Sequence, residues 1–139
     1  MKPMLLVAEG DPELRAIYSR FLAERSYNVQ TAADGLECIE KLRQLMPAVI
    51  LLDEDLRWGG GDGVLAWLRE QNTPVSVVLT ATAGCSPNIV RDSWPLVVKV
   101  LPKPFGLTAL LESVRAALTR RTREERCNLN RACSELFIG

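Results

Sequence analysis

Five short apolar runs recur along the chain, separated by longer segments of mixed polarity. The runs lie at Met4–Ala8, Tyr27–Thr31, Ala48–Leu52, Val75–Thr80 and Leu96–Leu101. The first, third and fourth are nearly continuous in valine, isoleucine and leucine. Such runs are typical of strands that are covered on both faces, as in a parallel sheet. The pattern therefore predicts five strands.

The segments between these runs carry apolar residues at helical spacing. The stripes are Leu14, Ile17, Tyr18, Phe21 and Leu22, then Leu36, Ile39, Leu42 and Met46, and finally Leu107, Leu110, Leu111, Val114 and Leu118. A further helix is expected through Val64 and Leu68. Between residues 83 and 95 we expect one short, irregular helix, because Pro95 ends it.

Helix start signals agree with these stripes. Asp11 followed by Pro12 has the form of an N-cap and a first-turn proline. Asp34 and Glu37 have the spacing of a capping box. Asp62 is predicted to cap the third helix. Strand and helix thus alternate five times, which predicts an α/β fold with a doubly wound, five-stranded parallel sheet.

Ligands of such a sheet lie outside the carboxyl ends of the strands. Glu9 follows the first predicted strand, Asp53 and Asp55 follow the third, Thr80 ends the fourth and Lys103 follows the fifth. We therefore expect acids, a hydroxyl and a lysine to meet at one edge. Carboxylates, lysine and hydroxyls together suit phosphoryl transfer, in which a carboxylate accepts the phosphoryl group and Mg²⁺ neutralises its charge.

Composition narrows the choice of chemistry. The chain has 139 residues, 47% of them hydrophobic, and a formal net charge of +0, so no overall charge favours nucleic acid. It has no histidine, and its four cysteines form no CxxC pair, which argues against histidine-dependent catalysis and a zinc site. No apolar run is long enough for a signal peptide or a membrane span. We expect a cytoplasmic protein.

The motifs "LLVAEGDPELR", "AADGLECI", "VILLDEDL", "VLTATA" and "LPKPF", in this order, resemble a receiver domain of the two-component response regulator family, as in the chemotaxis regulator. The resemblance covers roughly residues 3 to 119. It implies a flavodoxin-like (βα)5 fold with strand order 2-1-3-4-5. It also implies that the protein is a signalling domain and not an enzyme.

The resemblance assigns roles to individual residues. Asp53 resembles the phosphoacceptor, and Thr80 and Lys103 resemble the switch hydroxyl and the lysine that contact the phosphoryl group. Glu9, Asp53 and the backbone carbonyl of Asp55 resemble the Mg²⁺ ligands. The family also implies a cis bond before the proline that follows Lys103, and Trp58 is expected near the pocket.

Four departures make this an atypical receiver. Gly10 replaces the usual second metal-binding acid. Asp11 stands one place later and is a candidate metal ligand, but its position before Pro12 favours a role as helix N-cap. The loop after Asp53 is about two residues longer than usual and lacks proline. Val100 stands where the switch aromatic is expected, and the helix after Thr80 looks short. Mg²⁺ binding is therefore expected to be weakened.

Other functions remain open from the sequence. One is a pseudo-receiver that signals by protein contact without phosphorylation. Another is a phosphotransferase of the haloacid dehalogenase type, which also uses an aspartate nucleophile; its motif would normally follow the first strand. A third is a nucleotide binder that uses the glycines of "GGGDG", although no GxGxxG or Walker pattern is present.

The last residues differ from the rest. We expect a receiver domain over residues 1–119 and a C-terminal helical extension or tail over residues 120–139, whose arginines are offset by glutamates. The resemblance implies a sensor histidine kinase or phosphotransfer protein as phosphodonor, and a downstream protein target. It also allows a homodimer through the fourth helix, the fifth strand and the fifth helix, or through the tail. Neither nucleic acid nor membrane is an expected partner.

Overall fold

Each of the five apolar runs forms a strand in the computed structural model, which describes residues 2–82 and 96–120. The strands are β1 (Met4–Ala8), β2 (Asn28–Ala32), β3 (Val49–Asp53), β4 (Ser76–Ala81) and β5 (Val97–Pro102). The first matches its predicted bounds, and the other four begin and end one residue later than predicted. Strand prediction succeeded because both faces of the sheet are buried, so that each strand is a nearly continuous apolar run.

The strands form one sheet in the order β2-β1-β3-β4-β5, and every neighbouring pair is parallel. This confirms the predicted doubly wound α/β fold and its strand order. The order reverses direction at β1 and β3, so that their carboxyl ends flank a crevice where such sheets bind ligands. Asp53 is the last residue of β3 and pairs in register with Thr80 of β4.

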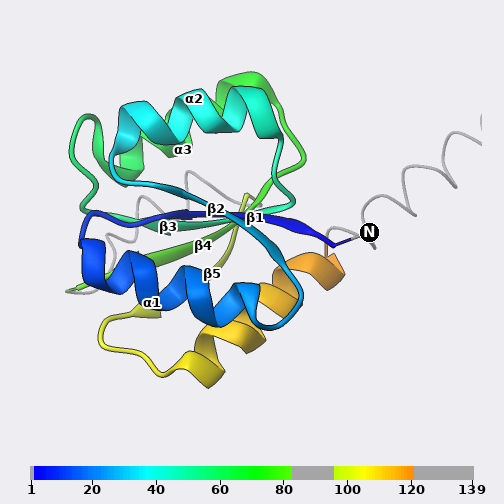
Figure 1. Cartoon of the computed structure of the whole chain (residues 1–139). Helices are drawn as coiled ribbons and strands as arrows, with labels where there is room; N and C mark the ends of the chain where they lie inside the picture. The colour runs from blue at the N-terminus through cyan, green and yellow to red at the C-terminus, as the bar shows by residue number, and fades with distance from the viewer. Residues whose placement is uncertain (1, 83–95, 121–139) are drawn as a thin grey trace, which may run out of the picture.

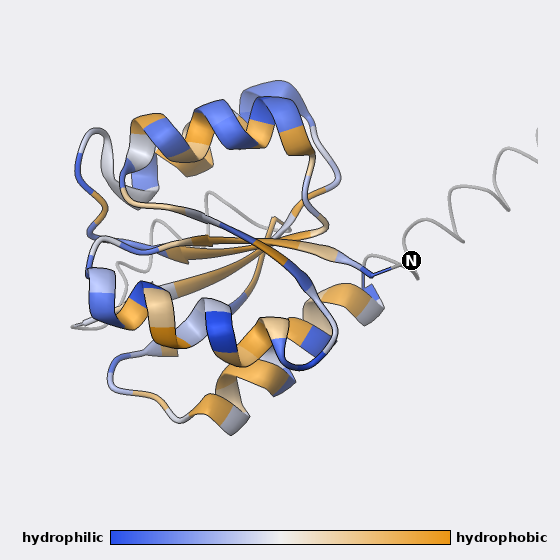
Figure 2. Cartoon of the chain, viewed as in Figure 1, coloured by the Kyte–Doolittle hydropathy of each residue, from blue (hydrophilic) through white to orange (hydrophobic). Residues whose placement is uncertain are grey.

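Helices cover both faces of the sheet (Figure 1). Helices α2 (Gly35–Leu45) and α3 (Gly60–Gln71) lie on one face. Helix α1 (Pro12–Ala23) lies on the other, beside a helix that spans residues 107–120. Figure 2 shows the strands to be mostly apolar and the helices to be apolar on the side toward the sheet.

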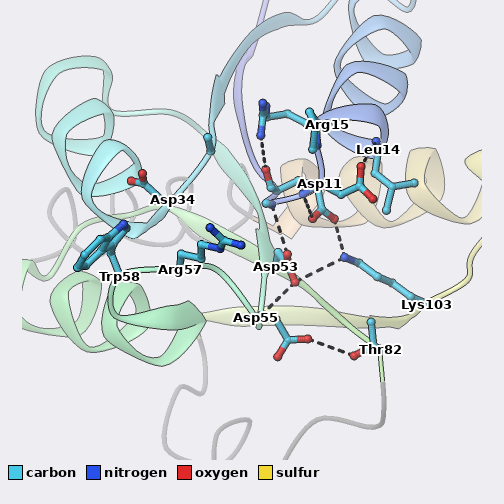
Figure 3. A pocket seen from close by; sticks show the side chains of 14 residues that line it. Asp11, Leu14, Arg15, Asp34, Asp53, Asp55, Arg57, Trp58, Thr82 and Lys103 are labelled. Atoms are coloured by element: carbon cyan, nitrogen blue, oxygen red, sulfur yellow. Dashed lines mark hydrogen bonds and ion pairs between the residues drawn. The ribbon is translucent and has the colours of Figure 1, made fainter.

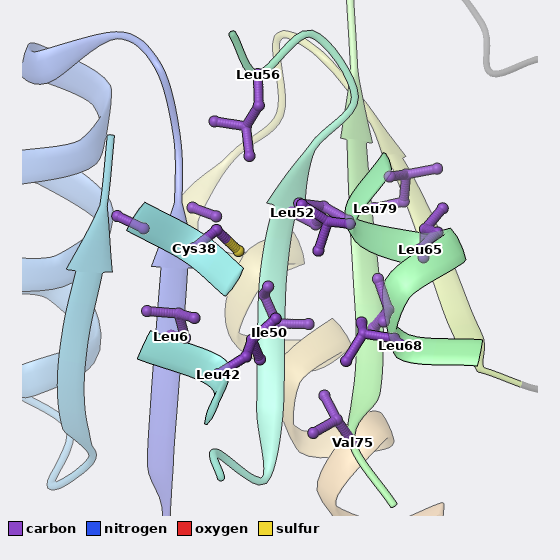
Figure 4. Close-up of a cluster of buried hydrophobic side chains, with 14 of the residues drawn as sticks. Leu6, Cys38, Leu42, Ile50, Leu52, Leu56, Leu65, Leu68, Val75 and Leu79 are labelled. Carbon is purple, nitrogen blue, oxygen red and sulfur yellow. The ribbon is translucent and has the colours of Figure 1, made fainter. Parts of the chain in front are cut away.

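Strand alternation divides the core into two clusters, because successive side chains of a strand point to opposite faces. Leu6 belongs to the cluster beneath α2 and α3, together with Cys38 of α2 and Leu65 of α3 (Figure 4). Its neighbour Leu5 belongs to the other cluster, together with Tyr18 of α1. The two clusters hold the helices on both faces and fix the sheet edge that carries the acids.

Two of the predicted helix caps are confirmed and one is wrong. The carboxylate of Asp11 accepts hydrogen bonds from the backbone N–H groups of Glu13 and Leu14, and that of Asp34 accepts one from Glu37. Asp62 does not cap α3, which begins two residues earlier at Gly60 and has Gly59 as its N-cap. The first two residues of α3 are glycines, which carry no side chain, so the apolar pattern could not reveal that the helix begins there.

Some expectations fall outside the described residues. They are the short helix between residues 83 and 95 and the tail beyond residue 120. Within the part of the chain that the structure describes, no helix combines the length and apolar character needed to cross a membrane.

Candidate functional site at the carboxyl edge of the sheet

Three charged side chains meet where β1, β3 and β5 end (Figure 3). Lys103 Nζ lies 2.6 Å from Glu9 Oε1 and 3.5 Å from Asp53 Oδ1. Glu9 is 2% exposed and Asp53 is 5% exposed. The sheet topology brings them together because each directly follows or ends a parallel strand. Buried charges persist only when they are paired and hydrogen-bonded, and this lysine and its two carboxylates satisfy that condition.

Backbone N–H groups orient the Asp53 carboxylate. Its Oδ1 accepts a hydrogen bond of 3.0 Å from the N–H of Asp55, and its Oδ2 accepts one of 3.4 Å from the N–H of Gly10. The carboxylate is thus held in one orientation at the floor of a cleft of about 710 Å³.

Glu9 and Asp53 differ in acid strength. Burial is the largest influence on both groups and favours their neutral forms. For Asp53, hydrogen bonding with Glu9 and with backbone N–H groups outweighs burial and lowers the pKa. For Glu9, burial and the adjacent Asp53 carboxyl raise the pKa despite the contact with Lys103. Because the two carboxyls interact closely, Asp53 is the member of the pair that loses its proton first.

Lys103 remains a cation in this setting. Burial alone would lower the pKa of its ammonium group, but the hydrogen bond to Glu9 and the charge of Asp53 outweigh it and raise that pKa. The peptide bond from Lys103 to Pro104 is cis, as the resemblance implied. Val100, the residue at the expected aromatic position, is half-buried against the core beneath α2 and α3.

The two threonines near the end of β4 occupy different places. Thr80 is 1% exposed and is not among the described residues that line the cleft. Thr82 lines the cleft, and its hydroxyl donates a hydrogen bond of 3.1 Å to Asp55 Oδ2. The sequence reasoning named Thr80 and missed Thr82, because Thr82 lies one residue beyond the end of β4.

Few acids in this cleft are available to a metal ion. Within residues 2–82 and 96–120, no group of three or more acidic, cysteine or histidine side chains is arranged to hold one. Asp11 uses one carboxylate oxygen, Oδ1, for the helix cap. Glu9 Oε1 is paired with Lys103, and Oε2 accepts a hydrogen bond of 3.1 Å from the Asp11 N–H. The carboxylate of Asp53, the backbone carbonyl of Asp55, part of the Glu9 carboxylate and the second oxygen of Asp11 remain, and oxygen donors of this kind suit Mg²⁺.

A bent loop between β3 and α3 forms one wall of the cleft. Trp58, Gly59 and Gly60 all have positive φ angles, of 61°, 98° and 64°. Trp58 is 70% exposed, and it lines the cleft as the sequence predicted. Two arginines, Arg15 and Arg57, also line it. The sequence reasoning missed both arginines, because neither belongs to an apolar stripe or to the acidic motifs at the strand ends.

The open parallel sheet, with paired acids and a lysine at its carboxyl edge, has the flavodoxin-like α/β fold. The family model of the response regulator receiver domain matches residues 5–115, so the chain belongs to that family. Receiver domains of response regulators are signalling domains of two-component systems, and response regulators interact with histidine kinases and downstream targets.

Similar proteins come from several bacteria. The chain is 30% identical over 131 residues to the response regulator MprA of a Mycobacterium species, which covers 90% of this chain and 54% of MprA. It is 29% identical over 119 residues to the transcriptional regulatory protein PrrA of Mycobacterium leprae, covering 86% of this chain and 51% of that protein. The chain therefore spans about half the length of these relatives.

Solved structures share the fold. The signal receiver domain of a putative Luxo repressor protein from Vibrio parahaemolyticus matches with a TM-score of 0.82 and 24% identity, covering 91% of this chain and 98% of that one. The chemotaxis protein CheY4 of Vibrio cholerae matches with a TM-score of 0.75 and 24% identity, covering 85% and 100%.

Proposed function

We propose that Asp53 accepts a phosphoryl group from a sensor histidine kinase or phosphotransfer protein, and that the modification switches protein contacts. The arrangement of Asp53 carries this proposal. Its carboxylate is held at the cleft floor, its pKa is lowered, and Lys103 Nζ lies 3.5 Å from Oδ1. An ionised and oriented carboxylate beside a cation is a nucleophile for phosphorus.

The transfer forms one bond and breaks another. A carboxylate oxygen of Asp53 attacks the phosphorus and forms an O–P bond, which gives an acyl phosphate. The P–N bond to the donor histidine breaks, and its electron pair stays on the imidazole nitrogen. The Lys103 ammonium, now shared with Glu9, is close enough to move onto a phosphoryl oxygen. Thr80 is proposed to donate its hydroxyl there after a local shift, since it is buried beside Asp53 in register.

Mg²⁺ is the cofactor that the family generally uses. In this chain Asp53, Glu9 and the backbone carbonyl of Asp55 would hold it, and Asp11 is a further candidate with one free carboxylate oxygen. When bound, Mg²⁺ neutralises charge on the phosphoryl oxygens. Because Gly10 brings no carboxylate, we propose that Mg²⁺ binds more weakly here than a site with two adjacent acids would allow.

The pseudo-receiver remains the second candidate, and one observation favours it. Lys103 is already engaged by Glu9 at 2.6 Å, and the described residues hold no three-acid metal cluster. In that case the chain would signal through protein contact while Asp53 stays unmodified. The same experiment separates the two functions.

Incubation with acetyl phosphate, with and without Mg²⁺, followed by intact mass spectrometry, tests the proposal. A functioning receiver gains the mass of one phosphoryl group, which hydroxylamine removes because the product is an acyl phosphate. Asp53→Asn should abolish the adduct. Asp62→Asn is the matched control, because Asp62 is exposed and does not line the cleft. No adduct at any Mg²⁺ concentration, or one that survives Asp53→Asn, would refute phosphorylation at this residue.

We also propose the domain bounds, the partners and the cellular location of the protein. The receiver domain is placed at residues 1–119, and the segment 120–139 is placed as a helical extension or tail. A downstream protein target is proposed, as is a homodimer through the surface of the fifth strand and its neighbouring helices or through the tail. The proposed location is the cytoplasm.

A further inference from the structure

The backbone around Arg57 is fixed by contacts on both sides. The carbonyl of Arg57 accepts a hydrogen bond of 2.8 Å from the N–H of Gly35, at the start of α2. A Cβ on Gly35 would lie 2.1 Å from the Trp58 carbonyl oxygen, so the two backbones are in direct contact. On the other side, the N–H of Gly61 donates to the carbonyl of Glu54 at 2.9 Å. The loop between β3 and α3 is therefore held in a defined position.

This position sends the Arg57 side chain into the phosphoacceptor cleft. Figure 3 shows its guanidinium group pointing toward Asp53 from the side opposite Lys103. Arg57 and Lys103 line the same cleft together with Asp53 and Asp55. Two cationic groups of different shape thus face the proposed phosphoacceptor.

The cations of the cleft differ in what they already bind. Lys103 is paired with Glu9 and Asp53, and Arg15 Nη1 donates a hydrogen bond of 2.9 Å to the carbonyl of Glu9. Among residues 2–82 and 96–120, no carboxylate lies within ion-pair distance of the Arg57 guanidinium. Its donors are therefore available to an incoming group that carries negative oxygens.

The same cleft has no carboxylate at position 10, which is a glycine. A Cβ on Gly10 would lie 3.8 Å from Asp53 Oδ2, so a side chain at this position would face the phosphoacceptor oxygen, and glycine leaves that space open. With fewer carboxylates to hold a divalent cation, the charge of a phosphoryl group must be neutralised in part by other means. A guanidinium offers planar, paired donors that match phosphate oxygens.

We propose that Arg57 binds the phosphoryl group as it is transferred to Asp53 and supplies part of the charge neutralisation otherwise given by Mg²⁺. This inference rests on the proposed phosphorylation of Asp53. In the transfer from acetyl phosphate, the O–P bond to acetate breaks, the bond to Asp53 forms, and acetate leaves with the electron pair. Arg57 forms hydrogen bonds to the phosphoryl oxygens and exchanges no proton.

The test compares rates of adduct formation from acetyl phosphate, measured by intact mass, in EDTA and in saturating Mg²⁺. Wild type should form the adduct slowly in EDTA. Arg57→Gln should lower the EDTA rate by about tenfold or more, the usual scale for losing a hydrogen bond to a charged group. In saturating Mg²⁺, the rate of Arg57→Gln should fall much less relative to wild type. Arg57→Lys should restore part of the rate in EDTA, because lysine keeps the positive charge but lacks the planar, paired donors of the guanidinium.

Arg20→Gln is the matched control, since Arg20 lies in the last turn of α1 and pairs with an exposed partner, Glu24. It should behave as wild type in both conditions. Equal rates for wild type and Arg57→Gln in both conditions would overturn the inference and leave the receiver function intact. An equal loss in both conditions would also overturn it, because that pattern indicates a structural effect. Complete absence of the adduct in wild type would instead refute phosphorylation of Asp53 itself.

Discussion

At the scale of single residues, the sequence identified the groups that the topology brings together. Glu9, Asp53 and Lys103 could be predicted because each stands at the end of an apolar run, and parallel strands end at one edge. Arg57 and Thr82 could not be predicted in the same way. Their positions depend on the path of a loop and on which way a strand end faces, and neither is encoded in apolar spacing.

Gly10→Asp should tighten Mg²⁺ binding. The Cβ fits, with Asp53 Oδ2 as its nearest contact at 3.8 Å, and the new carboxylate adds ligand charge, so we expect the Kd for Mg²⁺ to fall about tenfold. Trp58 fluorescence or calorimetry measures this. Gly10→Asn is the control of equal size without charge. Equal affinities of the two variants would contradict the view that a missing charge limits the metal site.

Cys38 should be chemically inert in the folded protein. Burial, followed by the nearby charges of Glu37 and Asp34, raises the pKa of its thiol to about 12, and the thiolate is the reactive form. In a variant with Cys85, Cys127 and Cys133 replaced by serine, iodoacetamide at mildly alkaline pH should label the protein only after urea is added. Labelling of the native protein, detected by mass, would show that the α2 face of the core opens readily.

At the scale of elements, prediction succeeded where side chains carry the signal and failed where they are absent. Strands were located within one residue, since each is a continuous apolar run. Helix α3 was expected to start at Asp62 but starts at Gly60, which is the last of three consecutive residues with positive φ. A left-handed conformation costs a non-glycine residue about 1–2 kcal/mol, so contacts of the loop with α2 must hold Trp58 in place.

Gly35→Ala tests that contact. The added methyl would lie 2.1 Å from the Trp58 carbonyl oxygen, and we expect the free energy of unfolding to fall by about 1–3 kcal/mol. Gly63→Ala is the control, because nothing lies within 4 Å of its Cβ. It should leave stability unchanged or raise it by about 0.5–1 kcal/mol through helix propensity. Urea unfolding measures both, and a stable Gly35→Ala protein would mean that the loop can move away from α2.

At the scale of the whole molecule, the fold stabilises an edge that gathers buried charge. Both faces of the sheet are covered by apolar clusters, and their packing compensates for the two acids and the lysine at the carboxyl ends. This architecture was predictable as a whole because strand and helix alternate regularly along the chain. The electrostatic balance at the edge follows from the topology and contributes to the stability of the entire domain.

Lys103→Met should make the stability of the domain strongly dependent on pH. Without the ammonium group, Glu9 and Asp53 are left as buried carboxylates without a cation, and near neutral pH we expect a loss of about 1–3 kcal/mol in unfolding free energy. The raised pKa of Glu9 means that the folded state keeps its proton at a pH where the unfolded chain, near 4.5, has lost it. The stability from this group is thus present at low pH and is lost as pH rises through the folded pKa.

Removing Lys103 takes away an influence that lowers the pKa of each carboxyl, so the difference from wild type should be small near pH 4.5, the ordinary value for glutamate, and should grow as pH rises. Urea unfolding of both proteins across this range measures it. Lys99→Met is the matched control, because Lys99 is exposed and lies on β5, the strand that Lys103 follows; it should change stability little at any pH. A Lys103→Met deficit that stays constant with pH would place the role of Lys103 in packing, and one that grows would place it in holding the two carboxylates together.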